Sequence, residues 1–134
     1  MQFLFSSPTF PFSKAVIHSG RTLETVLTGI PEGESRPVRG GVGAELAEIF
    51  RQLDRVLAVS NIDKTAIVSV RLYLQDVLRD IAETNEVYKA YFGAHPPNRR
   101  AYGVNLQGGM LIEAAFVAEV PPKRSSGVTI STER

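Results

Sequence analysis

The sequence predicts an α+β fold in which a mixed β-sheet carries two helices on one face. Two stretches show the spacing of apolar residues that is typical of an amphipathic helix, and five or six shorter stretches read as strands. These elements follow one another in the order β-β-α-β-α-β-β, which suggests a layer of helices on a single sheet. A chain of 134 residues is long enough for one domain with a substantial core.

The composition indicates a globular protein and argues against several classes of function. Hydrophobic residues make up 43% of the chain and charged residues 22%, which are ordinary values for a soluble domain. The formal net charge of +1 gives no strong field to attract nucleic acid or an acidic membrane surface. No apolar run approaches the ~20 residues of a membrane span. The N-terminus lacks the basic region of a signal peptide, so we expect a cytoplasmic protein.

Neither thiol chemistry nor a metal site is expected. The chain contains no cysteine, which excludes disulfides, thiol catalysis and cysteine-ligated metals, and which is compatible with a reducing compartment. Its two histidines, His18 and His95, are far apart in the sequence, and neither has ligand spacing around it.

The N-terminal part is predicted to supply strands and a loop. Residues 1–10 are apolar and aromatic and would add an edge strand. Residues 12–18 and 22–28 read as the two strands of a hairpin around the turn at 19–21. Residues 30–43 are rich in proline and glycine and are therefore predicted to be a loop.

Two helices are predicted, over residues 44–59 and 77–92. The apolar stripe of the first consists of Leu46, Ile49, Phe50, Leu53, Val56 and Leu57. Its charged residues, among them Glu45 and Glu48, are expected on the other side. The buried stripe of the second helix is expected to consist of Val77, Ile81, Tyr88 and Phe92. The spacing of Asn85 puts a polar amide on that stripe, and a glycine and a diproline end the helix.

The strand predicted over residues 66–74 has two unequal faces. One face would carry only apolar side chains, namely Ala66, Val68, Val70, Leu72 and Leu74. The other would carry Ile67, Ser69, Arg71 and Tyr73. This second face is too mixed for a core and too apolar for plain solvent. We therefore expect it to be covered by other copies of the chain, and a face of this kind is a common place for a site.

Residues 96–118 are predicted to form a hairpin, in which two extended segments are joined by a turn at Gly108-Gly109. Glu113 is the one carboxylate in the second segment, and alternation places it on an otherwise apolar surface. A buried carboxylate needs a partner or a function. Arg99 or Arg100, at the start of the neighbouring segment, could supply the partner. The proline-led, patternless stretch 121–134 is expected to be a flexible tail after a single domain over residues 1–120.

Five stretches of the sequence resemble motifs of one protein family. Residues 11–16 read Pro-Phe-Ser-Lys-Ala-Val and resemble a Pro-Tyr-Ser-x-Ala-Val motif, and residues 28–31, Thr-Gly-Ile-Pro, resemble Ser-Gly-Gln-Ile-Pro. Residues 85–92 read Asn-Glu-Val-Tyr-Lys-Ala-Tyr-Phe and resemble Asn-x-x-Tyr-x-x-(Phe/Tyr)-Phe. Residues 97–99 match Pro-x-Arg, and residues 113–114 match a Glu-Ala pair in a final strand. In this order and spacing the motifs resemble those of the YjgF/RidA family of enamine/imine deaminases, also described as L-PSP endoribonuclease-like proteins.

The resemblance extends over roughly residues 11–120. It implies a chorismate-mutase-like α+β fold and a homotrimer with active sites in the clefts between subunits. It also implies hydrolysis of reactive enamine or imine acids, such as 2-aminoacrylate, to 2-keto acids and ammonia, without a cofactor.

The resemblance assigns roles to individual residues. Arg99 would hold the substrate carboxylate through a bidentate fork that a lysine does not reproduce. Glu113 would orient and deprotonate the attacking water. Backbone groups around Gly29 and Ala101 would bind polar atoms of the substrate, with Asn85 as a polar neighbour. The expected catalytic pair is Arg99 and Glu113, and the expected substrate-binding residues are Phe12, Thr28, Gly29, Asn85, Arg99 and Ala101.

The chain also departs from the family pattern. Phe12 stands in place of the usual tyrosine and lacks its hydroxyl, and it could serve packing alone. Residues 28–30 differ from Ser-Gly-Gln, Ala101 stands where many members have cysteine, and the loop 105–110 is about one residue shorter. Arg100 adds a second cation. These changes leave the carboxylate-binding part in place and suggest a different keto, imino or aromatic acid as substrate.

Each of these candidate site residues could instead have a purely structural role. Arg99 and Arg100 could pair with surface acids, and Glu113 could form a salt bridge across a trimer with Arg71. Asn85 could cap or bridge backbone groups. At the level of function, the alternative to a deaminase is a non-catalytic trimer that binds a small carboxylate, and a third hypothesis is an endoribonuclease. The near-neutral charge and the absence of basic-aromatic clusters argue against the third.

Overall fold

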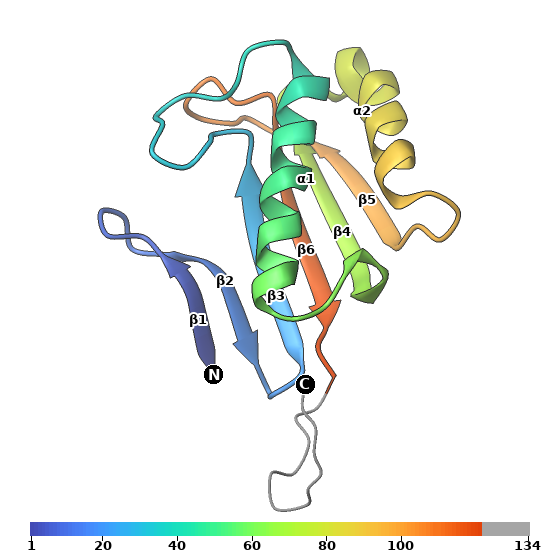
Figure 1. The fold of residues 1–134 in the computed structure, drawn as a ribbon. Coiled ribbons are helices and arrows are strands. Elements are labelled where there is room, and N and C mark those ends of the chain that lie inside the picture. The colour runs from blue at the N-terminus through green and yellow to red at the C-terminus, as the bar shows by residue number, and fades with distance from the viewer. Residues whose placement is uncertain (122–134) are drawn as a thin grey trace, which may run out of the picture.

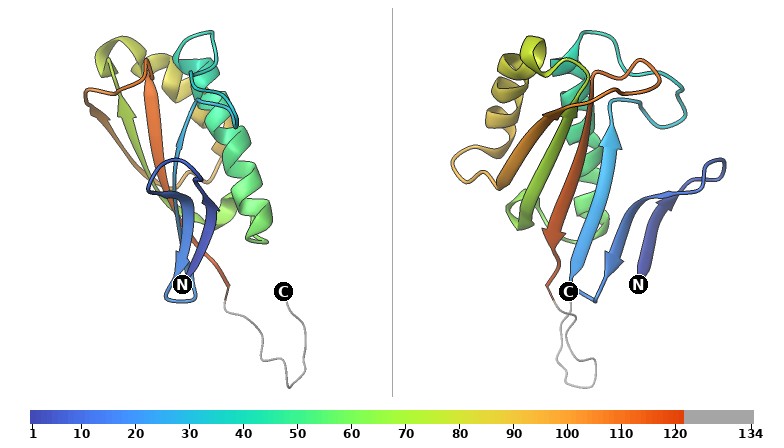
Figure 2. Two further views of the ribbon diagram at one scale, coloured as in Figure 1. Left: turned by 90° about the vertical axis from the view of Figure 1, so that its left-hand side faces the viewer. Right: turned by 180° about the vertical axis from the view of Figure 1, so that it is seen from behind.

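The computed structural model describes residues 1–121 and contains a six-stranded sheet with two helices on one face (Figure 1). Its elements are β1 (Gln2–Ser6), β2 (Ser13–His18), β3 (Thr22–Thr28), α1 (Val42–Val59), β4 (Ile67–Leu74), α2 (Val77–Phe92), β5 (Asn98–Gly103) and β6 (Ile112–Glu119). The strand order is β1-β2-β3-β6-β4-β5. β5 runs parallel to β4, and the other neighbouring pairs are antiparallel. Figure 2 shows both helices on the same side of the sheet, so the predicted α+β architecture is confirmed.

The predicted hairpin over residues 96–118 is wrong, because β5 and β6 are not neighbours in the sheet. β4 lies between them and pairs with both. The reason is the β4–α2–β5 unit, since a strand that follows a crossover helix returns parallel to the first strand and takes the place beside it. β6 therefore pairs with the other side of β4. Gly108 and Gly109 do adopt positive φ angles of 70° and 77°, but they lie in the longer connection over residues 104–111.

The core lies between the helices and the inner face of the central strands. α1 contributes the predicted stripe, which is buried throughout: Leu46, Ile49, Phe50, Leu53, Val56 and Leu57. β6 contributes Ile112, Ala114, Phe116 and Ala118, which alternate along the strand and are all buried. Phe50 of α1 stacks on Tyr91 of α2 with ring centroids 4.0 Å apart, which joins the two helices. No helix within residues 1–121 is long and apolar enough to cross a membrane.

The start of β4 departs from the predicted alternation. Ala66 ends a 3₁₀ helix that begins at Lys64, and a bulge between Ile67 and Ser69 shifts the register against β6. Ile67 is consequently buried and Val68 is 50% exposed, the reverse of the expectation. Beyond the bulge the two faces of the strand are as predicted.

α2 has the predicted bounds, and Tyr88 and Phe92 are buried as predicted, but the N-terminal half of its buried stripe differs from the prediction. Its buried residues are Asp80, Thr84, Tyr88 and Phe92. Val77 and Ile81, which were expected in the stripe, are only half-buried, and Asn85 is exposed beside it. Asp80 tolerates burial because Arg79 binds both of its carboxylate oxygens, Nε to Oδ1 at 2.9 Å and Nη2 to Oδ2 at 2.8 Å.

The outer face of the sheet carries no helix of the described residues. Val26 of β3 is 50% exposed there, and Tyr102 of β5 is 41% exposed. Ala115 and Val117 of β6 lie between them and are half-buried. This face is more apolar than a solvated surface requires, which is consistent with the expectation that another copy covers it. The trimer itself stays a prediction.

Candidate functional site

Glu113 lies near the start of β6, on the outer face of the sheet. Its partners across the sheet are Thr28 at the end of β3 and Tyr73 on β4, so the three side chains point to the same side. The carboxyl is half-buried, and the ion pairs found among residues 1–121 do not include it. Burial raises the pKa of Glu113 above the ordinary glutamate value. Such a carboxyl exchanges a proton closer to neutral pH, as a general base must.

A cavity of about 400 Å³ opens beside this carboxyl. It is lined by Tyr73, Val104, Asn105, Leu106, Gln107, Met110 and Glu113. Tyr73 stacks on Tyr102 of the neighbouring strand with ring centroids 5.6 Å apart, which fixes the aromatic wall. The cavity therefore combines one acid and two side-chain amides with apolar and aromatic side chains, so it offers both polar and apolar contacts to a small molecule.

The loop that forms the far wall of the cavity is anchored at both ends. The Val104 amide donates to the Leu74 carbonyl at 2.9 Å, and the Leu106 amide donates to Gln75 Oε1 at 2.6 Å. At its other end the Leu111 amide donates to Glu45 Oε1 of α1 at 2.9 Å. These bonds preform the wall without any ligand.

Gly29 follows Thr28 directly and lies against α1. A Cβ atom at this position would lie 2.7 Å from the Cβ of Glu45, closer than real Cβ atoms approach. The glycine is thus required by the close approach of the helix, and this packing role is independent of any substrate contact.

We expect Gly29→Ala to lower the free energy of unfolding by about 1–3 kcal/mol, because the added methyl group overpacks a contact that is already closed. Urea denaturation followed by circular dichroism measures the change. Ser35→Ala, an exposed position in the following loop, is the matched control and should leave the midpoint unchanged. An unaltered urea midpoint for Gly29→Ala would show that α1 can move away from the added methyl group without loss of stability.

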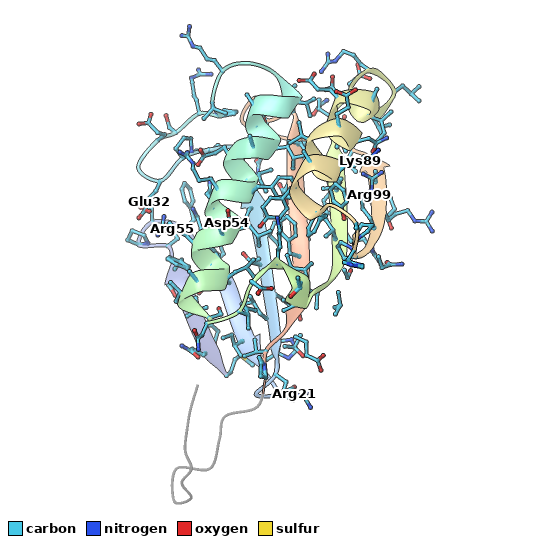
Figure 3. The ribbon with its side chains drawn as sticks, turned by 45° about the vertical axis from the view of Figure 1, so that its right-hand side comes forward. Arg21, Glu32, Asp54, Arg55, Lys89 and Arg99 are labelled. Carbon is cyan, nitrogen blue, oxygen red and sulfur yellow. The ribbon has the colours of Figure 1, made fainter. Side chains whose placement is uncertain are left out.

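Arg99 lies on the opposite face of the sheet from Glu113. Its partner on β4 is Val70, which is fully buried on the helix side. The guanidinium carbon of Arg99 lies 4.8 Å from the ring centroid of Tyr88 on α2, a cation–π contact, and Figure 3 shows Arg99 beside α2. The ion pairs among residues 1–121 do not include Arg99 either, so its five N–H donors remain available to a carboxylate ligand.

Two other expected site residues lie on the Arg99 side. Ala101 follows Arg99 by two positions on β5 and pairs with buried Leu72, so it faces the helices. Asn85 lies on α2, three residues before Tyr88, and is exposed. Tyr88 itself is only 6% exposed, its hydroxyl has no hydrogen-bond partner in the described part of the chain, and burial raises its pKa to about 12.

The structure thus divides the expected site into two groups. Thr28, Gly29 and Glu113 come together on β3 and β6, whereas Asn85, Arg99 and Ala101 come together on α2 and β5. β4 separates the two groups. The side chains of Thr28 and Glu113 face the outer side of the sheet and those of Arg99 and Ala101 face the helices, whereas Gly29 directly follows β3 and lies against α1. The expectation that a neighbouring strand brings Arg99 to Glu113 is therefore wrong within one chain.

Arg100 shares the outer face with Glu113 but not its neighbourhood. Its partner on β4 is Arg71, and that strand stands between Arg100 and β6. Arg71 is engaged locally, with Nη1 donating to Asn98 Oδ1 at 2.9 Å and to the Val70 carbonyl at 3.0 Å. Within one chain, neither arginine forms an ion pair with Glu113.

Phe12 lies in the connection between β1 and β2, at the edge of the sheet opposite to β5. It is 56% exposed and stacks on Phe10, with ring centroids 6.1 Å apart. Two exposed aromatic rings at a sheet edge are poorly placed for solvent.

The sequence reasoning missed a set of buried polar residues on α1. Glu45 and Glu48 were assigned to the solvent side, yet they are 3% and 6% exposed, and Gln52 is 8% exposed. Their spacing of three and four residues places them on one stripe beside the apolar one. This regular spacing could have indicated a buried polar stripe, although the charges of Glu45 and Glu48 had suggested that they face solvent.

Comparison with known proteins gives consistent matches. Residues 6–120 match the family described as Endoribonuclease L-PSP. The chain is 30% identical over 118 residues to the 2-iminobutanoate/2-iminopropanoate deaminase of Rattus norvegicus, covering 87% of this chain and 85% of that protein. It is 31% identical over 109 residues to the Homo sapiens protein of the same name, covering 81% of this chain and 79% of the other.

Solved structures share the fold. A putative endoribonuclease from Thermotoga maritima superposes with a TM-score of 0.79 at 22% identity, over 89% of this chain and 97% of that one. RidA from an Antarctic Psychrobacter superposes with a TM-score of 0.75 at 24% identity, over 86% of this chain and 93% of that one.

Proposed function

The chain belongs to the endoribonuclease L-PSP family, also known as YjgF/RidA, and on this premise we propose that it hydrolyses 2-imino acids to 2-keto acids and ammonia. The relatives named 2-iminobutanoate/2-iminopropanoate deaminase support an imine substrate. The observation that carries the proposal is that neither Arg99 nor Glu113 takes part in an ion pair among residues 1–121. A structural salt bridge within one chain would have used one or both.

The proposed chemistry assigns one task to each charge. Arg99 binds the carboxylate of the imino acid with two parallel N–H donors. Glu113 accepts a proton from a water molecule as that water attacks the carbon of the C=N bond. The same carboxyl then returns that proton to the nitrogen, which gives a carbinolamine with a hydroxyl and an amino group on one carbon. In the second step Glu113 accepts the hydroxyl proton and passes it to the amino nitrogen as the C–N bond breaks, so that ammonia leaves and the carbonyl of the keto acid forms. The raised pKa of Glu113 suits a group that both accepts and returns a proton.

The proposal also assigns the two groups of residues to different subunits. Arg99 and Glu113 lie on opposite faces of one sheet, so a single copy cannot direct both at one substrate. In a ring of identical copies, a contact between two different surfaces brings Arg99 of one copy to Glu113 of the next. The apolar outer face and the exposed rings at the β1–β2 edge supply surface for such a contact.

We expect two inactive variants to restore each other's activity when they are mixed. Arg99→Ala and Glu113→Gln are each nearly inactive alone. In a refolded equal mixture, a site that takes Arg99 from one copy and Glu113 from the next is intact in about one quarter of cases. Ammonia release from 2-iminobutanoate generated in situ is measured before and after mixing, with each variant refolded alone as the control.

The outcomes of this experiment separate the claims. Acceleration by the wild type together with recovery in the mixture supports a deaminase with shared sites. Acceleration by the wild type without recovery in the mixture places both residues in one copy and contradicts the shared site. If the wild type does not accelerate release at all, the deaminase proposal fails.

A non-catalytic carboxylate-binding protein is the second candidate, favoured by Phe12, which offers no hydroxyl to substrate or water. It predicts that a 2-keto acid binds with an affinity that depends on Arg99, while no imine is turned over. Isothermal titration with 2-oxobutanoate beside the turnover assay distinguishes the two.

A further inference from the structure

The polar stripe on α1, defined by Glu45, Glu48 and Gln52, is buried beneath the end of β3. These residues are 3%, 6% and 8% exposed. Buried polar groups are costly unless they form hydrogen bonds, so their partners indicate what the stripe is for. The partners lie next to the Glu113 group of site residues.

Gln52 makes the widest set of contacts. Its Nε2 donates to the Thr28 carbonyl at 3.1 Å and to the Ile30 carbonyl at 3.0 Å. The same nitrogen lies 2.9 Å from Glu48 Oε2, and Oε1 accepts from Lys14 Nζ at 3.4 Å. One amide therefore links α1 to β2 and to both sides of Gly29.

These contacts fix the backbone of residues 28–30 from the helix side. The carbonyls on either side of Gly29 are held by Gln52, and the Gly29 carbonyl accepts from the Val38 amide at 2.9 Å. Gly29 itself is pressed against Glu45. On the other side of the strand, Thr28 stands directly across from Glu113. A shift of these peptide planes would move Thr28 relative to the acid.

We propose that Gln52 is a positioning residue for the candidate site, acting through residues 28–30, of which Thr28 stands across the sheet from Glu113. The proposal rests on the proposed function, because it supposes that Thr28 and Gly29 contact the substrate. Gln52 does not touch the substrate, and it contributes by holding one short segment in a single conformation.

The test replaces the amide by an apolar side chain of similar length. Gln52→Met fills the space and removes all four contacts. We expect KM for 2-iminobutanoate to rise about tenfold with a smaller fall in kcat, because the binding surface loses its fixed geometry. A purely structural role lowers the amount of folded enzyme, which reduces kcat and leaves KM unchanged.

Tyr91→Phe is the matched control. Tyr91 Oη donates to Asp54 Oδ1 of α1 at 2.5 Å, so the variant also removes a polar contact of α1, but on the side of α2. We expect its KM to equal that of the wild type. Should Gln52→Met fail to fold, Gln52→Asn keeps a shorter amide and should show the same rise in KM to a smaller degree.

A second readout needs no substrate. Hydrogen exchange of the backbone amides of Thr28, Gly29, Ile30 and Glu32 in the ligand-free protein should be about tenfold faster in Gln52→Met and unchanged in Tyr91→Phe. Faster exchange with an unaltered KM contradicts the positioning role while leaving the deaminase proposal intact. Unchanged exchange contradicts the inference directly. An inactive wild type contradicts the deaminase proposal and with it the catalytic part of this inference, whereas the exchange data still decide whether Gln52 holds the segment.

Discussion

We expect Arg99→Lys to lower kcat/KM for 2-imino acids by about 100-fold, which corresponds to about 2.7 kcal/mol of transition-state binding. The positive charge is retained, so the loss reports the geometry of the guanidinium. Arginine presents a planar fork that matches both carboxylate oxygens, while a lysine ammonium reaches them as a point charge. The stacking of Arg99 on Tyr88 holds the fork in one orientation, and lysine loses part of that contact as well.

Arg100→Lys is the matched control for this prediction. It changes the adjacent residue of β5 in the same way, but on the other face of the sheet, beside Arg71. The steady-state parameters of the control should stay within about twofold of the wild type, since surface substitutions of this kind are nearly neutral. An equal fall in kcat/KM in both variants would show that β5 does not tolerate replacement of an arginine by a lysine at either position. It would contradict a specific role for Arg99.

We expect Glu113→Gln to lower kcat by about 10²- to 10⁴-fold with little change in KM, because the amide keeps the shape of the acid but cannot accept a proton from water. Glu119→Gln, on the same strand but exposed and paired with Arg21, is the control and should retain activity. Wild-type activity in Glu113→Gln would exclude this carboxyl as the base.

The pH dependence of the wild type follows from the same group. Burial raises the pKa of Glu113, so activity falls on acidification through that raised pKa rather than through the ordinary glutamate range. The free energy of unfolding changes with pH in the opposite direction to the activity. Between the ordinary and the raised pKa the native state binds more protons than the unfolded state, so stability falls as pH rises through this window. Above it, Glu113→Gln should unfold at a higher urea concentration than the wild type.

The bounds of the helices were predictable because helical periodicity is local. α2 has the predicted bounds, and α1 begins two residues earlier than predicted. The facing of individual side chains was harder to predict. Spacing alone placed Asn85 in the buried stripe of α2, but the structure buries Asp80 and Thr84 there instead. A buried aspartate is tolerable at this position because Asp80 forms an ion pair with Arg79.

The pairing of β5 and β6 was not predictable from the turn between them. Gly108-Gly109 fits a hairpin, yet the crossover through α2 had already placed β5 beside β4. Such pairings depend on contacts between distant parts of the chain, which no local pattern records. The same error concealed the division of the candidate site, because a hairpin would have joined the Arg99 segment to the Glu113 segment directly.

The central position of β6 has a consequence for synthesis on the ribosome. β6 is the last strand of the described residues, and it fills the gap between β3 and β4. Until residues 112–119 emerge, both of those strands present an open, largely apolar edge to the surrounding proteins. The nascent chain therefore passes through a stage with two unpaired strand edges, and we expect a chain terminated before residue 112 to aggregate more readily than the full chain.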